Sequence, residues 1–117
     1  MSMEADLVNL LKTVCPRVFP DVAPANTVKP FLTWQPLGGE SLRFLNNEAP
    51  DKRNTYLQVS VYSTTRLESL NLIRAAEEAL CASPAFVAKP QGEPIATYED
   101  DTTLYGAIQR FSIWAAR

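Results

Sequence analysis

Hydrophobic and polar positions alternate from Thr55 to Tyr62 and then change to a helical spacing. Leu57, Val59 and Val61 fall on one side of the alternation, and aromatic or polar residues fall on the other. Because successive strand side chains point to opposite faces, this stretch predicts a strand with one aliphatic face. Apolar residues then recur every three or four positions, which predicts an amphipathic helix up to residue 82 with a stripe of Leu67, Leu70, Ile73, Ala76 and Leu80.

The same two spacings predict the other elements. Ser63 or Thr64 supplies the hydroxyl that caps the helix after the alternating strand. An earlier amphipathic helix is expected over residues 3–15 and a short strand over residues 31–35. The last third predicts a hairpin with arms over residues 94–99 and 104–115.

Two stretches carry no regular pattern. Residues 16–30 hold four prolines and are expected to be an ordered connector, pinned to the core by Val18, Phe19 and Val22. Residues 38–54 form a long polar segment, which in a small domain is usually functional or mobile. Alternatively, residues 41–46 add a short edge strand to the sheet.

The elements therefore follow the order helix, strand, strand, helix, strand, strand. We expect one domain over residues 1–117, of the α+β class, with a mainly antiparallel sheet of about four strands packed with two helices. Both faces of the final strand carry apolar residues, whereas a sheet with one wet face alternates more cleanly. Either a second helix or another subunit is expected to cover the other face.

Composition excludes several classes of function. The 117 residues carry 11 basic and 13 acidic side chains, and the net charge of −2 does not favour nucleic acid or an anionic membrane. No apolar run approaches the roughly 20 residues that span a bilayer, and the first residues do not resemble a signal peptide, so we expect a cytoplasmic protein. The absence of histidine removes the commonest general base and zinc ligand. We expect no enzyme activity, no cofactor and no metal.

The two cysteines, Cys15 and Cys81, each fall near the end of a predicted helix. We expect two buried free thiols, because a structural disulfide is uncommon in a cytoplasmic chain, although the count allows one.

Opposite charges gather on two predicted projections. The long polar segment carries Arg43, Lys52 and Arg53, and the hairpin tip carries Glu99, Asp100 and Asp101. Neither group has the spacing of a phosphate or cation site, so each is a solvated loop or a contact with another protein. The strand aromatics are explained by core packing or by a subunit interface, where aromatic residues are enriched; they are Trp34, Trp114, Tyr56 and Tyr62.

Three strings in this order give the chain a family resemblance. They are the proline-led strand PFLTWQP, the strand-to-helix run YLQVSVYSTTRLESLNLIRAAEEAL and the closing hairpin with YEDDTTLYGAIQRFSIW. With them the chain resembles the tail terminator, or tail completion, proteins of tailed phages and prophages, over residues 3 to 115.

The resemblance implies a structural protein that forms a ring, commonly of six subunits, on the head-proximal end of the tail tube. The ring ends tube polymerisation and helps to join the head. Its implied partners are further copies of itself, the tail tube protein and the head–tail connector. It is implied to occupy the host cytoplasm during assembly and then the virion tail.

A ring needs two different, complementary patches on each subunit. We therefore expect the basic residues Arg43, Lys52 and Arg53 to meet the acidic tip of a neighbour. Two other interpretations stay open at this point: a head–tail connector or neck component, and a small cytoplasmic enzyme or ligand-binding domain, which requires a pocket with convergent polar groups.

Overall fold

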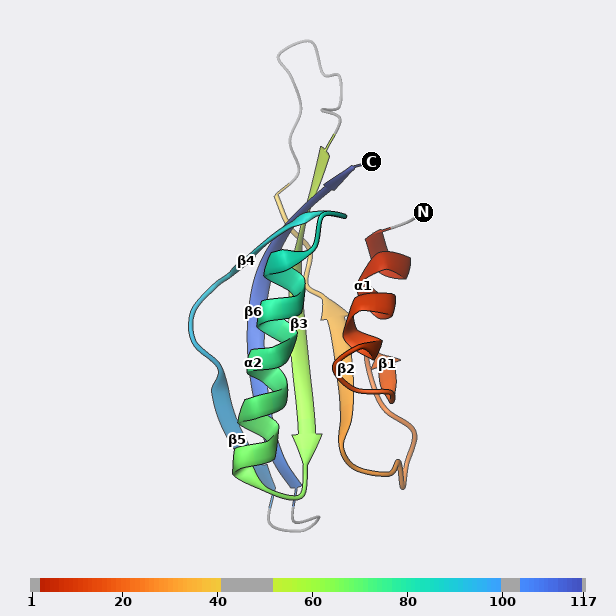
Figure 1. The fold of residues 1–117 in the computed structure, drawn as a ribbon, viewed down its shortest axis with the longest axis vertical. Coiled ribbons are helices and arrows are strands. Elements are labelled where there is room, and N and C mark those ends of the chain that lie inside the picture. The colour runs from red at the N-terminus through yellow and green to blue at the C-terminus, as the bar shows by residue number, and fades with distance from the viewer. Residues whose placement is uncertain (1–2, 41–51, 100–103, 117) are drawn as a thin grey trace.

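The computed structural model describes residues 3–40, 52–99 and 104–116. These residues form two helices and six strands (Figure 1). In chain order the elements are α1 (Met3–Lys12), β1 (Val18–Pro20), β2 (Phe31–Pro36), β3 (Lys52–Ser63), α2 (Arg66–Ala82), β4 (Val87–Pro90), β5 (Ile95–Glu99) and β6 (Leu104–Ala116).

The strands form one mixed sheet in the order β1-β2-β3-β6-β4, and β5 pairs with the same edge of β6 as β4. Its centre is the long antiparallel pair of β3 and β6, in register from Lys52 opposite Ala116 to Ser63 opposite Tyr105. β1 runs parallel to β2. The α+β class agrees with the prediction, but a mainly antiparallel sheet of about four strands is wrong, because β1 and β4 add strands and β1 makes the sheet mixed.

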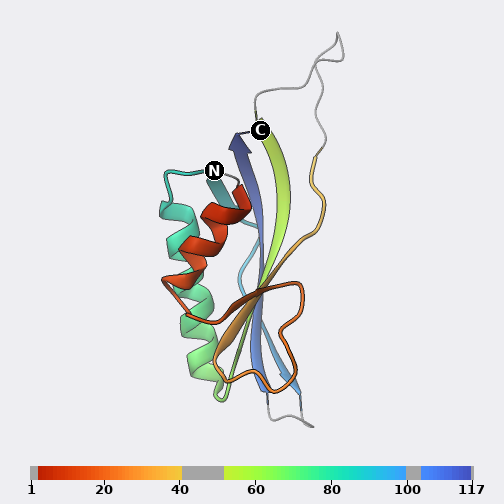
Figure 2. The same ribbon diagram turned by 90° about the vertical axis from the view of Figure 1, so that its right-hand side faces the viewer.

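The aliphatic face of β3 lies in the core, as its alternation predicts. Leu57, Val59 and Val61 are fully buried beneath α2 and lie opposite Phe111, Gln109 and Ala107 of β6. Both helices cover this face of the sheet (Figure 2). The remaining large core side chains come from both helices and the neighbouring strands: Leu7, Leu11, Leu32, Ile73, Leu80 and Ile113.

The predicted helix stripe is confirmed in its middle and wrong at its start. Ile73, Ala76 and Leu80 are fully buried, whereas Leu67 in the first turn is 70% exposed. The N-cap is Thr65 rather than Ser63 or Thr64, because its side chain accepts a hydrogen bond from the Glu68 amide at 3.2 Å. Ser63 instead donates a hydrogen bond to the Glu68 carboxylate, so the backbone amide and the side chain of Glu68 are both held at the start of α2.

Replacing Thr65 with alanine is expected to lower the free energy of unfolding by about 1 kcal/mol, because the Glu68 amide loses its acceptor. Urea unfolding followed by circular dichroism measures the change. Thr64→Ala is the matched control, since Thr64 is exposed and does not cap the helix. Equal effects of the two substitutions would contradict the assignment of the cap.

The proline-rich connector is anchored at its ends and projects in its middle. The guanidinium Nε of Arg17 donates to the Pro30 carbonyl at 2.9 Å, and the Leu32 amide donates to the Arg17 carbonyl. Val18 packs against the core, but Val22 is 79% exposed, so the prediction that Val22 pins the connector is wrong. The middle of the connector lies on the side of the sheet opposite the helices (Figure 2).

The hairpin of β5 and β6 is confirmed, with Ile95 opposite Ile108 and Glu99 opposite Leu104. The alternative edge strand over residues 41–46 lies outside the described residues.

Candidate functional site

The face of the sheet opposite the helices carries the candidate functional surface, and the proline-rich connector lies over part of it. Directly paired residues in an antiparallel sheet share a face, so the register assigns the side chains of this open face. They form rows across the strands: Val87, Trp114 and Asn54; Lys89, Ser112 and Tyr56; Arg110, Gln58 and Gln35; Ile95, Ile108, Ser60 and Thr33; Thr97, Gly106, Tyr62 and Phe31. Neither helix of the described residues lies on this face (Figure 2).

The open face is aromatic at its two ends and polar in its middle. Phe31 and Tyr62 pack with ring centroids 5.1 Å apart at one end, and Tyr56 and Trp114 lie toward the other. In the middle, the guanidinium Nε of Arg110 donates to Gln58 Oε1 at 3.3 Å. Exposed apolar side chains flank this centre on the edge strands, with Val87 50% and Ile95 66% exposed. Such a mixture of aromatic, arginine and apolar groups is typical of protein–protein interfaces.

The four aromatic residues singled out in the sequence divide between the two faces. Trp34 is 7% exposed on the helix side, which is core packing, and its Nε1 lacks a hydrogen-bond partner in the described residues. Trp114, Tyr56 and Tyr62 lie half-buried on the open face.

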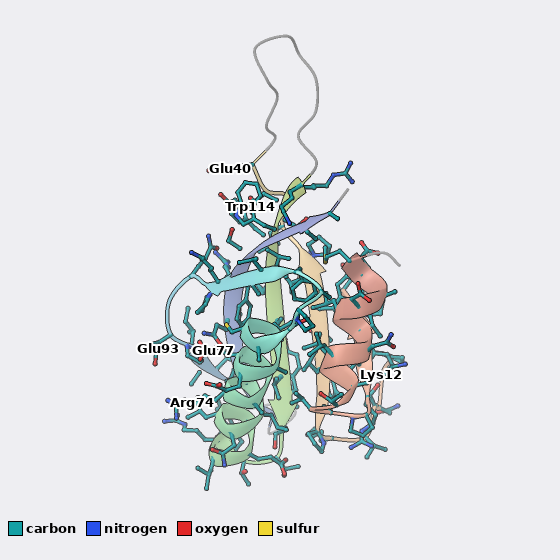
Figure 3. All side chains as sticks on the ribbon, turned by 45° about the horizontal axis from the view of Figure 1, so that its top comes forward. Lys12, Glu40, Arg74, Glu77, Glu93 and Trp114 are labelled. Atoms are coloured by element: carbon teal, nitrogen blue, oxygen red, sulfur yellow. The ribbon has the colours of Figure 1, made fainter. Side chains whose placement is uncertain are left out.

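Gln109 is a buried polar residue that the sequence did not single out. It lies on the helix side of β6, where its Nε2 donates to Glu77 Oε1 of α2 at 2.6 Å and to the Gly92 carbonyl at 3.0 Å. Figure 3 shows Glu77 on α2 with Arg74 nearby. Gln109 therefore ties α2 and the connection between β4 and β5 to the centre of the sheet. A glutamine between apolar positions in the final strand was the available signal.

A cavity of about 550 Å³ opens where the connector projects over the open face. Its lining combines connector residues with strand residues: Asp21, Val22, Ala23, Pro24, Asn26, Thr27, Lys29, Phe31, Thr33, Tyr62 and Leu104. The lining contains one acidic and one basic side chain among hydroxyl and apolar groups. It has no cluster of acidic and thiol side chains, and the described residues hold no such group able to bind a metal ion.

The predicted contact residues lie at opposite ends of β6. Lys52 and Arg53 begin β3 opposite Ala116 and Ala115, whereas Glu99 ends β5 opposite Leu104. Twelve positions of β6 separate these ends, about 40 Å at about 3.4 Å per residue. Arg43, Asp100 and Asp101 lie outside the described residues. Among the described residues, the structure thus separates Lys52 and Arg53 from Glu99 within one chain.

The two thiols have different surroundings. Cys15 is buried, with its Sγ 3.5 Å from the Pro30 carbonyl oxygen, whereas Cys81 is exposed on α2. Both are free, and the prediction that both are buried is wrong for Cys81, which sits past the buried stripe of its helix. The pKa of the Cys81 thiol is raised. Partial desolvation is the largest cause, and the negative charges of Glu77 and Glu78 are the smaller ones.

We expect Cys81 to react with iodoacetamide more slowly than the cysteine of an unstructured peptide at the same pH. A raised pKa leaves less thiolate, which is the nucleophile. Glu78→Gln removes one of the charges and should speed the reaction at a fixed pH near 8, as mass spectrometry of timed samples measures. An unchanged rate in Glu78→Gln would exclude the charge as a cause.

A comparison with protein families identifies the chain. Residues 3–116 match the family described as "Tail completion protein gp17". The chain belongs to this family. No curated protein matches its sequence.

Membership in the tail completion family confirms the resemblance seen in the sequence. It makes the protein a structural component of a phage tail, which interacts with other tail components. None of the helices in the described ranges is long and apolar enough to cross a membrane. The open face is the candidate functional site of this family member.

Proposed function

We propose that the protein is a single tail-terminator-like domain that forms a ring on the head-proximal end of a phage tail tube. The ring ends polymerisation of the tube and helps the tail to join the head. Its partners are further copies of itself, the tail tube protein and the head–tail connector. The subunit waits in the host cytoplasm and enters the virion during assembly, without an enzymatic step.

The observation that carries this proposal is the one-sided packing of the helices. Both lie on one face of the sheet, and the open face presents Tyr56, Trp114 and Arg110 among exposed apolar side chains. The apolar groups of β6 on the open face require a cover, and no helix of the described residues provides it. A neighbouring subunit is the cover that a tail ring supplies.

The charged ends are proposed to contact other proteins of the tail. Lys52 and Arg53 mark one end of the central strand pair and Glu99 marks the other. In a ring whose axis follows β3 and β6, these two ends face opposite directions along the tube. We assign them, with Arg43, Asp100 and Asp101, to the contacts with the tube and the connector.

Electron microscopy of particles made without this gene tests the function. We expect overlong tails without heads, because growth of the tube is no longer stopped. Tails of normal length that fail to join heads would assign the protein to the connector instead. Intact infectious particles would overturn a role in the virion.

Reversing both acidic charges with Asp100→Lys and Asp101→Lys is expected to reduce the number of joined particles, while the purified subunit keeps its melting temperature. The reason is that like charges then face the partner surface. Adding Lys52→Glu and Arg53→Glu should not restore joining, since the two ends meet different partners. Restoration by the second pair would instead show that neighbouring subunits meet end to end. Particle counts by electron microscopy distinguish the two results.

A further inference from the structure

The middle of the open face is basic. Lys89 lies opposite Ser112, and Arg110 lies two positions earlier on β6, so the two side chains occupy adjacent rows of the same face. Both are exposed, and neither forms an ion pair within the described ranges. The strand residues of these two rows add only Gln35, Gln58, Tyr56 and Ser112, so neither row contains a strand carboxylate that would offset the two charges.

The opposite side of the subunit is acidic at the same level. Glu77 is fixed to this level because Gln109, the neighbour of Arg110 in β6, donates to its carboxylate. Glu78 follows it on the exposed surface of α2, and Cys81 is one turn further. Arg74 precedes them by one turn but forms no ion pair with either in the part of the chain that the structure describes.

A closed ring requires that two surfaces which meet lie at the same height along the ring axis, because neighbours in a cyclic ring are related by rotation without a shift along the axis. In a ring whose axis follows β3 and β6, the basic and acidic surfaces satisfy this condition. The end groups, Lys52 and Glu99, do not, because they lie at opposite ends of β6.

We infer that the open face of one subunit receives helix α2 of the next copy, with Lys89 and Arg110 facing Glu77 and Glu78. This inference rests on the proposed ring and names its subunit contact. Exposed apolar groups on both surfaces lose water in the same contact: Val87 and Ile95 on the sheet, and Leu67 on the helix.

Charge reversal in particles tests the contact. Lys89→Glu with Arg110→Glu should give overlong tails, because two carboxylates then face the acidic helix. Adding Glu78→Lys should restore normal tail length in part; Glu77 is kept because it binds Gln109. The control is Lys12→Glu, which reverses one positive charge at an exposed position of α1, outside the proposed contact, and should leave tail length unchanged. Melting temperatures of the purified variants establish that each folds.

A cross-link gives an independent readout. In Lys89→Cys, a short bismaleimide applied to purified tails should join the introduced thiol of one copy to the native Cys81 of the next and give a ladder of oligomers. The two positions lie on opposite sides of the sheet, and Cys15 is buried, so a ladder reports a contact between copies. The ladder should disappear when Cys81→Ser is added.

Failure of the proposed subunit contact can be distinguished from failure of the proposed function. Overlong tails in the deletion, combined with normal tails in Lys89→Glu/Arg110→Glu and no ladder, would overturn the face-to-helix contact and leave the terminator function standing. Normal particles in the deletion would overturn the function itself.

Discussion

Replacing Phe111 with alanine is expected to lower the free energy of unfolding by about 3–5 kcal/mol. Phe111 is fully buried, and it lies opposite Leu57 in the central strand pair and opposite Pro90 of β4. Truncation therefore removes contacts with two strands at once and leaves a cavity beneath the helices. Urea denaturation at equilibrium measures the loss.

Arg110→Ala is the matched control for this prediction, because Arg110 is the preceding residue on the same strand and its side chain is exposed on the other face. We expect its effect on the free energy of unfolding to stay within about 0.5 kcal/mol. An equal loss in the two variants would contradict the assignment of faces along β6. Arg110→Ala should also give a folded protein in which the proposed subunit contact is weakened.

Replacing Gly106 with alanine is expected to cost about 1–3 kcal/mol, because the site has no room for a methyl group. A Cβ there would lie 2.4 Å from Thr97 Oγ1 and 3.2 Å from the Tyr62 ring. The glycine thus lets the side chains of two neighbouring strands close over β6. Thermal and urea unfolding of the variant measure the loss.

If the contact with Thr97 causes the loss of stability in Gly106→Ala, removing the Thr97 hydroxyl group should reduce that loss. Thr97→Ala removes the closest atom, so the double variant Gly106→Ala/Thr97→Ala should recover part of the stability, and a double-mutant cycle gives the coupling between the sites. Additive losses would show that a cause other than this contact makes Gly106 necessary.

The sequence predicts those helices and strands that are determined by the spacing of their own apolar residues. The alternation in β3 and the spacing in α2 are set by which side chains are apolar, so the buried residues Val59, Val61 and Ile73 follow directly. Leu67 was included in this stripe and yet is exposed, because six positions at about 100° each turn it about 120° away from Ile73. Ser69 is the buried residue of the first turns instead.

The short strands could not be predicted because tertiary pairing creates them. Val18–Pro20 and Val87–Pro90 contain prolines and have three or four residues, too few for a period to be seen. Each becomes a strand because β2 or β6 offers a free edge beside it. The positions of the predicted charged groups depend on which strand ends lie side by side, and the register of β3, β5 and β6 determines this.

The open face is likewise a property of the fold. Gln58, Arg110 and Lys89 are ordinary polar positions in the sequence, and only the register gathers them at one place on the sheet. The apolar residues on both sides of β6 were the available signal, and they predicted a cover from a helix or from another subunit. The described helices lie on the other face of the sheet, so the proposed cover of the open face is a neighbouring copy.

The prolines at the sheet margins have a consequence for how copies associate. β1 ends in Pro20, β4 ends in Pro90, and Pro94 precedes β5. Proline has no amide hydrogen to donate, and short margin strands with proline resist pairing with strands of other molecules. Edge-to-edge pairing of sheets into open-ended fibres is therefore disfavoured. In the proposed ring, association uses the broad surfaces of the molecule, where rotation by a fixed angle produces an assembly of finite size.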